Sequence, residues 1–233
     1  MIRLFTVVIS VMYLVSTSPI LAGTWVDDFG DGNLDPWQLE NPPMEGSVWN
    51  VENGECSGQY ANAPAGICSA LELRVENAAT WGDYSVVCNV KLVENFGGGF
   101  FGIFFRAAPG WEVQKDYLAY VDLDAKKIAF RKDGIQKLSE SPLPFNITEG
   151  IWYKLEVIAE GEHFEFYIDD DLTGSFDDNS YPSGTIWLTV RNAHAHFDDL
   201  VITGPEIPDG GPGFAVTYQN KLATMWGGVK RGK

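Results

Sequence analysis

Residues 100–107 read Phe-Phe-Gly-Ile-Phe-Phe-Arg-Ala, and this short apolar stretch decides the class of fold. Successive side chains of a β-strand point to opposite faces of its sheet. If Phe101 and every second residue after it face a core, Phe104 and Arg106 face the opposite side. The stretch therefore predicts a strand with one buried face and one face that combines aromatic rings with an arginine.

Similar short alternating runs continue from residue 24 to about residue 207, separated by glycine, asparagine, aspartate and proline. Asn53-Gly54 and Asp133-Gly134 suit tight hairpins, so neighbouring strands should be antiparallel. No stretch has the periodicity of a long amphipathic helix. The pattern is typical of an all-β, two-sheet antiparallel sandwich. It predicts strands at residues 24–29, 48–52, 55–60, 69–75, 84–92, 100–107, 117–122, 127–132, 152–159, 163–168, 185–191 and 195–203.

Composition and charge limit the class of protein. The chain has 233 residues, 45% of them hydrophobic, so it can bury a large core, and intrinsic disorder is excluded for most of it. The length favours one main domain. The formal net charge of -16 would repel a polyanion, which argues against nucleic acid or an anionic membrane surface as a partner. Neutral sugars, divalent cations and basic surfaces remain open, and the acidity also fits a general role in solubility.

Both ends of the chain differ from the alternating part, residues 23–207, which we expect to form one domain. Residues 1–22 have the basic start, apolar run and small-residue site of a secretory signal peptide cleaved after Ala22; an uncleaved anchor is the alternative. We therefore expect a secreted, periplasmic or cell-surface protein without a membrane span after cleavage. Residues 208–233 combine a Gly/Pro-rich linker with a basic tail, which fits a disordered end or a sorting or surface-attachment segment.

Export would place the three cysteines in an oxidising compartment. Cys56 and Cys68 lie on adjacent predicted strands and could pair, which would leave Cys88 over. Cys88 alternates in register with the apolar residues of strand 84–92. We therefore expect Cys88 to be a small buried side chain rather than a nucleophile.

Strand 185–191 presents chemistry similar to that of strand 100–107, because its alternation leaves Trp187 and Arg191 outward. Another tryptophan, Trp152, opens a strand with inward apolar residues and is expected in the core. Three further tryptophans lie in predicted loops, where they could line a site or cover a sheet edge: Trp37, Trp81 and Trp111.

Strand 117–122 can present Tyr120 and Asp122 on its outward face. The opposite register, with Tyr117 outward, fits almost as well. Flat aromatic rings beside arginine donors and carboxylate acceptors suit a sugar, whose apolar face stacks on a ring while its hydroxyls form hydrogen bonds. Alternatively, this face packs under loops and the arginines pair with structural aspartates. The candidate ligand-binding residues are Phe104, Arg106, Tyr120, Asp122, Trp187 and Arg191.

Several short motifs occur in an order that resembles a known group of proteins. They are Trp25-Val26-Asp27-Asp28-Phe29, Val51-Glu52-Asn53-Gly54-Glu55, Trp81-Gly82-Asp83-Tyr84-Ser85-Val86, Gly102-Ile103-Phe104-Phe105-Arg106, Trp152-Tyr153-Lys154-Leu155-Glu156-Val157, Phe166-Tyr167-Ile168-Asp169 and His196-Phe197-Asp198-Asp199-Leu200. Over residues 25–207 the chain resembles the concanavalin A-like lectin/glucanase superfamily, particularly laminin G-like jelly rolls and the 3-keto-disaccharide hydrolase domain, formerly a domain of unknown function. The resemblance implies a two-sheet antiparallel jelly roll with its first and last strands paired and a ligand face on the concave sheet or its edge loops.

The resemblance also implies particular residue roles. The arginine that ends the Gly-Ile-x-x-Arg strand would face the concave site, and here it is Arg106. A structural calcium between the first and last strands would lie at Asp28 and Asp199, with Asp27 and Asp198 as near competitors. Calcium takes six to eight oxygen ligands, so backbone carbonyls or water would have to complete the shell.

An ordinary glucanase of this fold is disfavoured. A retaining glycosidase needs two carboxyl groups about 5–5.5 Å apart, and the Glu-x-Asp-x-Glu run that supplies them on one strand does not occur in this sequence. No Gly-x-Ser-x-Gly motif supports a serine hydrolase. His194, His196 and Asp198 alternate on one face of a predicted strand, where they could bind a transition metal, act as acid and base, or form a solvated edge.

The sequence therefore supports three hypotheses and leaves the identity of the sugar and the oligomeric state open. The favoured one is an exported, non-catalytic carbohydrate-binding or adhesion-type jelly roll. The second is a 3-keto-glycoside hydrolase or lyase, whose base would be one of these histidines or a carboxylate near Arg106. The third is a structural surface protein without a small ligand.

Overall fold

The computed structural model describes residues 22–39, 44–110 and 115–214. Within them the regular structure is antiparallel β-strand together with one short 3-10 helix, η1 (Ala78–Thr80). This confirms the predicted all-β antiparallel class. The strands are β1 (Gly23–Asp27), β2 (Trp37–Leu39), β3 (Ser47–Glu52), β4 (Glu55–Tyr60), β5 (Ser69–Leu73), β6 (Tyr84–Ala107), β7 (Tyr117–Asp122), β8 (Lys127–Lys132), β9 (Gln136–Pro142), β10 (Trp152–Glu160), β11 (His163–Ile168), β12 (Asp171–Asp177) and β13 (Thr185–Gly204).

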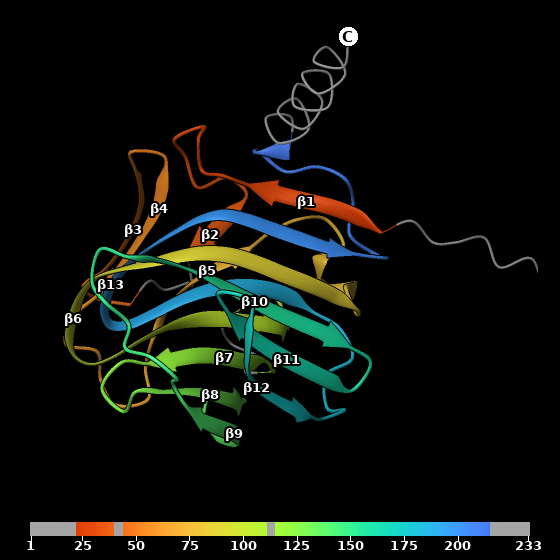
Figure 1. The fold of residues 1–233 in the computed structure, drawn as a ribbon. Helices are drawn as coiled ribbons and strands as arrows, with labels where there is room; N and C mark the ends of the chain where they lie inside the picture. Colours follow the sequence, from red (N-terminus) through yellow and green to blue (C-terminus); the bar gives the residue numbers. More distant parts are fainter. Residues whose placement is uncertain (1–21, 40–43, 111–114, 215–233) are drawn as a thin grey trace, which may run out of the picture.

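Two long strands, β6 and β13, run through both layers of the sandwich (Figure 1). The first half of β6 pairs with β10 and its second half pairs with β7. β13 pairs with β6 along most of its length, with a register shift between Arg191 and Ala193, where Asn192 has positive φ. Gly97 and Gly98 also have positive φ at the neighbouring point of β6. Irregularities of this kind bend strands, so each strand can pass from one sheet to the other.

The two layers are named here after one strand each. The β7 sheet consists of β9, β8, β7, the second half of β6, the first half of β13, β5 and β2. The β10 sheet consists of β12, β11, β10, the first half of β6, the second half of β13, β4 and β3. Further along, β13 also pairs with β1. In Figure 1, β7, β8 and β9 follow one another in the lower part of the molecule.

The main core lies between the two sheets. Phe101, Ile103 and Phe105 of β6 are fully buried in it, as their alternation predicts. Tyr117 also belongs to this core, and its ring centroid lies 5.4 Å from that of Phe105. The favoured register of β7, with Tyr120 on the opposite face, is therefore confirmed.

The first and last strands pair as the resemblance implied, with Gly23 opposite Gly204. The chain then turns back and follows the other edge of β1. Val26 N–H donates to Gly210 O over 2.9 Å, and Gly213 N–H donates to Val26 O over 3.1 Å. The folded part therefore continues beyond the predicted boundary at residue 207 into the predicted linker. The rest of the predicted tail, residues 215–233, and residues 1–21 of the predicted signal peptide lie outside the described residues.

The structure does not contain the disulfide that the sequence left open between Cys56 and Cys68. Cys56 lies in the main core between the sheets, whereas Cys68 belongs to a second buried cluster on the outer face of the β7 sheet. No disulfide joins them. The pairing was considered because the two cysteines lie on or next to strands that are adjacent in the sequence. These strands, β4 and β5, pair with different parts of β13. Cys88 is buried in the core, as expected.

The expected place of Trp152 is also wrong. Tyr153, Leu155 and Val157 of β10 are the residues directed into the core, so Trp152 points outward and is 36% exposed. Lys91 Nζ lies 4.3 Å from the centroid of its ring. Trp81 lies in a loop, as expected, and is buried. Trp37 is also buried, but it opens β2 instead of lying in a loop. Trp111 lies outside the described residues.

Three strands were not predicted: β2, β9 and β12. β9 and β12 are edge strands with mostly polar sequences, so they lack the apolar alternation that marks a strand with a buried face. Among the described residues, no helix is long and apolar enough to span a membrane.

Candidate functional site

A hollow of about 250 Å³ lies on the face of the β7 sheet that points away from the main core. Its floor is the second buried cluster, in which Phe104 of β6, Tyr120 of β7 and Trp187 of β13 contribute aromatic rings. Loop residues Gly66, Ile67 and Ala108 form part of its wall, together with Gly98 and Gly99 of β6. The lining residues with polar or aromatic side chains are Phe100, Phe104, Asp116, Tyr120, Asp122, Arg131, Trp187 and Arg191.

The aromatic floor follows directly from strand register. Phe104 and Trp187 are cross-strand partners, and their ring centroids are 6.0 Å apart. The rings of Phe100 and Tyr120 approach to 4.9 Å. Gly102 lies on the same face as Phe100 and Phe104, and a Cβ there would lie 2.7 Å from the Tyr120 Cβ. A side chain at Gly102 would therefore collide with the floor.

Two arginines reach the hollow from different strands. Arg131 of β8 donates from Nε to the Tyr120 hydroxyl over 2.7 Å, and its guanidinium lies 5.4 Å from the Tyr120 ring centroid. Arg191 donates from Nη1 to Gly98 O over 3.2 Å. Its Nε is buried and has no hydrogen-bond partner among the described residues. Both arginines therefore have neutral partners, and Arg191 retains an unused donor.

Two carboxylates complete the polar lining. Asp122 Oδ1 accepts a hydrogen bond of 2.9 Å from Ala125 N–H, which closes the turn between β7 and β8. Asp116 precedes β7, and its Oδ1 is buried with no partner among the described residues. Burial raises the pKa of Asp116 to about 6; an N–H from Gly134 opposes this rise and the nearby Asp133 adds to it. Asp116 is therefore a buried acceptor that changes charge near neutral pH.

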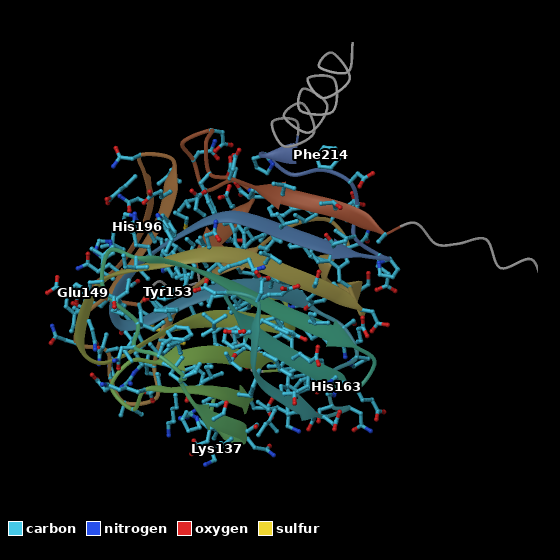
Figure 2. All side chains as sticks on the ribbon, viewed as in Figure 1. Lys137, Glu149, Tyr153, His163, His196 and Phe214 are labelled. Atoms are coloured by element: carbon cyan, nitrogen blue, oxygen red, sulfur yellow. The ribbon has the colours of Figure 1, made fainter. Side chains whose placement is uncertain are left out.

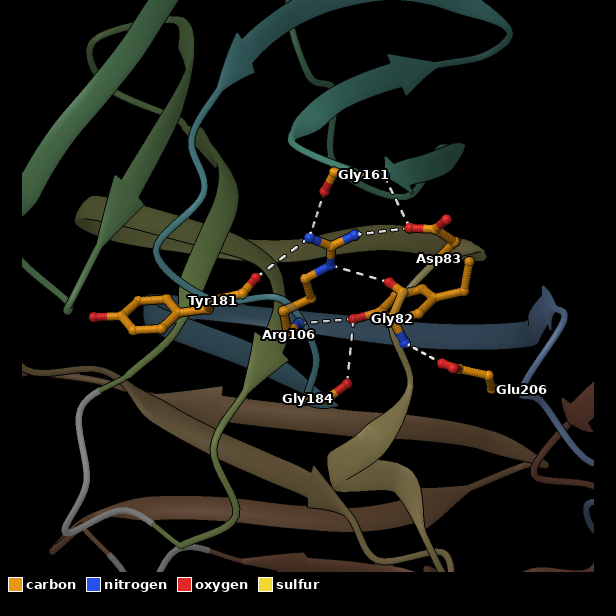
Figure 3. A network of polar contacts seen from close by, with 8 residues as sticks. Gly82, Asp83, Arg106, Gly161, Tyr181, Gly184 and Glu206 are labelled. Atoms are coloured by element: carbon orange, nitrogen blue, oxygen red, sulfur yellow. Dashed lines mark hydrogen bonds and ion pairs between the residues drawn. The ribbon is translucent and has the colours of Figure 1, made fainter.

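Arg106, predicted to face this site, does not line the hollow. Its backbone has a φ of 44°, which interrupts the alternation at the end of β6. The side chain is 2% exposed and lies among loops (Figure 3). It donates to Gly82 O over 3.0 Å and to Gly161 O over 2.7 Å, and it pairs with Asp83. Arg106 therefore fastens loops at one end of the sandwich, and we leave it out of the proposed site.

The aspartates predicted to bind calcium are occupied by hydrogen bonds within the protein. Asp28 Oδ1 accepts from Gly30 N–H over 3.1 Å, and Asp199 Oδ2 accepts from Asn89 Nδ2 over 3.0 Å. Asp27, a near competitor, accepts from the Trp37 indole N–H over 2.8 Å. Among the described residues, no group of three or more histidine, cysteine, aspartate or glutamate side chains is arranged to hold a metal ion. Calcium at Asp28 and Asp199 stays a prediction.

The structure places five of the predicted ligand-binding residues around one hollow: Phe104, Tyr120, Asp122, Trp187 and Arg191. Sequence reasoning missed Arg131 and Asp116. The alternation in β8 contains a signal for Arg131, because Ile128 and Phe130 face the core and Arg131 must face away. Asp116 lies in a loop, where no periodicity marks the direction of a side chain.

Comparison with known proteins gives related folds. No family model matches the sequence. Levanase from Bacillus subtilis (strain 168) is 25% identical over 127 residues, which are 53% of this chain but only 18% of the levanase. The carbohydrate-binding module CBM66 from Bacillus subtilis has a TM-score of 0.60 at 21% identity, covering 72% of this chain and 95% of that module. A Bacillus licheniformis β-glucanase has a TM-score of 0.57 at 14% identity, with 78% and 98% covered.

These similarities confirm that the chain has the concanavalin A-like jelly-roll fold. The solved structures include both a binding module and a glucanase, so the fold by itself does not separate binding from catalysis. That distinction has to come from the side chains in the hollow.

Proposed function

We propose that this protein is an exported, non-catalytic carbohydrate-binding module that holds a sugar in the hollow of the β7 sheet. The observation that carries the proposal is the combination of an aromatic floor with two unused buried polar atoms, Arg191 Nε and Asp116 Oδ1. An adhesion-type role would use the same binding event.

The two unused atoms point to hydroxyl groups. Arg191 Nε is a donor and ionised Asp116 Oδ1 is an acceptor. Leaving either buried without a partner costs about 1–3 kcal/mol. Both atoms are covered in the free protein, so each side chain has to rotate to present its atom to the hollow. A hydroxyl both donates and accepts, so a polyhydroxylated ligand then satisfies both atoms, while the rings of Phe104 and Trp187 offer apolar surface to its C–H face. The opposite charges of the arginines and aspartates favour a neutral ligand over a charged one.

The size of the hollow limits what can enter it. Its volume of about 250 Å³ lies just below the usual range of ligand pockets, roughly 300–1,000 Å³. It therefore suits one sugar unit of a glycan rather than a long stretch of chain. The names of the similar proteins, a levanase, a carbohydrate-binding module and a β-glucanase, make levan and β-glucan the first sugars to test.

The enzyme alternative, a 3-keto-glycoside hydrolase or lyase, has one observation in its favour. Asp116 lies at the hollow with a pKa of about 6, a value suited to a general acid or base. A retaining glycosidase would also need a second carboxyl group at close distance. Asp122 is engaged in closing a turn, so we favour binding without catalysis.

A binding experiment with matched variants tests the proposal. Isothermal titration with a panel that includes levan and β-glucan should give saturable binding of at least one sugar. Arg191→Gln should weaken that binding about 10- to 100-fold, because a charged hydrogen bond contributes about 1.5–3 kcal/mol. Lys154→Gln, on β10 and ion-paired with Asp170, is the control and should bind like the unaltered protein.

Three outcomes would overturn the proposal. The first is a complete lack of binding across the panel, which would favour a structural surface protein. The second is unchanged binding by Arg191→Gln. The third is turnover of a 3-keto disaccharide that disappears in Asp116→Asn, which would establish an enzyme.

A further inference from the structure

Two histidines lie side by side on the outer face of the β10 sheet, away from the sugar site. Ala193, Ala195 and Phe197 of β13 are buried in the main core, so the alternating residues His194 and His196 both point outward. Their ring centroids are 5.1 Å apart. In Figure 2, His196 is labelled on the upper left of the molecule, far from His163 at the lower right.

Each ring has one nitrogen held by a neighbouring side chain. His196 Nδ1 lies 2.5 Å from Glu55 Oε2, and the same carboxylate oxygen accepts a hydrogen bond of 2.7 Å from Lys91 Nζ. His194 Nε2 lies 2.9 Å from Ser57 Oγ. These contacts fix both ring orientations, while the other nitrogens, His196 Nε2 and His194 Nδ1, have no hydrogen bond to any described residue.

The contact between His196 and Glu55 has the form found around metal-binding histidines. In such sites the ring nitrogen that does not bind the metal donates its proton to a carboxylate, which fixes the tautomer and makes the other nitrogen a better ligand. The Lys91 ammonium lies 2.7 Å from Glu55 Oε2 and holds this carboxylate in place as the acceptor.

Negative charge lies close to the histidine pair. Glu52 and Glu94 both interact electrostatically with His194. These two carboxylates favour a bound cation.

We propose that His194 Nδ1 and His196 Nε2 together bind one divalent transition-metal ion, with Glu55 as the positioning carboxylate. No third ligand is already gathered there among the described residues, so water or a rotated Glu52 or Glu94 side chain fills the remaining positions. Imidazole nitrogens suit copper, nickel and zinc rather than calcium, and affinity should be highest for Cu²⁺. The site lies on the opposite sheet and does not depend on the proposed sugar site.

Copper titration of the metal-free, untagged protein tests this site. The chain has 3 histidines, and His163 of β11, paired with Asp177, provides a matched control. We expect one Cu²⁺ per chain, with an electron paramagnetic resonance spectrum that shows coupling to two imidazole nitrogens. His194→Gln and His196→Gln should each lower the affinity at least about 10-fold, and Glu55→Gln should lower it about 10- to 100-fold. His163→Gln should leave it unchanged.

The spectrum of the unaltered protein keeps the test decisive even if a variant fails to fold. Coupling to a single nitrogen, or loss of binding in His163→Gln with retention in His194→Gln, would overturn the proposal. Binding no tighter in the unaltered protein than in the variant lacking both His194 and His196 would also overturn it. Sugar titrations should be the same with and without copper, because the two sites lie on opposite sheets.

Discussion

The guanidinium of Arg106 and the carboxylate of Asp83 form an ion pair, with 3.1 Å between Nη2 and Oδ1 (Figure 3). The same Asp83 oxygen accepts the Gly161 N–H over 2.8 Å, so the pair joins the turn after β10 to the segment before β6. Arg106 also donates to backbone carbonyls of both segments. This arginine therefore acts in folding at one end of the sandwich, whereas Arg131 and Arg191 reach the hollow.

Arg106→Ala should lower the free energy of unfolding by on the order of 2 kcal/mol, because it removes a buried guanidinium together with its hydrogen bonds to partly buried carbonyls. Sugar affinity of the folded variant should be unchanged. Urea unfolding and titration of the same preparations measure both quantities. Arg131→Gln is the matched comparison. We expect this variant to bind sugar more weakly and to lose less stability than Arg106→Ala. Lost binding with full stability in Arg106→Ala would contradict this division of roles.

Sugar affinity should fall as the pH drops below about 6. A sugar hydroxyl that donates to Asp116 favours the ionised carboxylate, so protonation of a group with a pKa of about 6 opposes binding. Asp116→Asn should remove this pH dependence. The other charged groups at this place are Asp122 and Arg131, which line the same hollow, and Asp133, which lies near Asp116. Titrations at a series of pH values measure the effect, and an identical pH profile in Asp116→Asn would assign it to another group.

Protonation of Asp116 has opposite effects on sugar affinity and on folding stability, so its effect on binding can be distinguished from acid unfolding. The pKa of Asp116 is higher in the folded protein than the ordinary aspartate value of 3.8. The folded state therefore binds more protons between these two values, and this carboxyl contributes more stability as the pH falls from about 6 towards 4. Thermal melts of the free protein over this range should not show a loss of stability from Asp116 that parallels the loss of sugar binding.

A reducing agent should leave the melting temperature unchanged, since Cys56 and Cys68 lie in separate buried clusters and no disulfide links them. Thiol titration after unfolding should detect all 3 cysteines of the chain. A melting temperature that drops on reduction, or a mass that indicates two fewer thiol hydrogens, would support a Cys56–Cys68 bridge instead.

The calcium prediction has a separate test. If an ion binds Asp28 and Asp199, added calcium should raise the melting temperature above its value with a chelator, because a ligand that binds the folded state stabilises it. Asp28→Asn should abolish that difference. Equal melting temperatures in calcium and in chelator would indicate that the hydrogen bonds from Gly30 and Asn89 are the only role of these carboxylates.

Strand alternation accounts for most of what the sequence predicted correctly. Phe104 and Trp187 were assigned to the outward face from their own strands, and pairing of β6 with β13 places them together. Tyr120 joins them because Tyr117 is needed in the core. A strict period of two residues therefore identifies which side chains share a face, even without knowledge of which strands pair.

The same rule fails where the backbone leaves the strand conformation. The positive φ of Arg106 ends the alternation of β6, and only the folded loops supply the carbonyls that hold its side chain. Asp116 reaches the hollow from a loop, through contacts between distant segments that sequence spacing does not encode. The bends that let β6 and β13 serve both sheets likewise depend on tertiary packing, so each was predicted as two separate strands.

The most direct test of the central claim is a crystal structure of the protein with the tightest-binding sugar of the panel. We predict a sugar ring against Phe104 and Trp187, with hydroxyl oxygens in hydrogen-bond distance of Arg191 Nε and Asp116 Oδ1. A sugar bound on the β10 sheet, or a hollow without sugar at saturating concentration, would contradict the account.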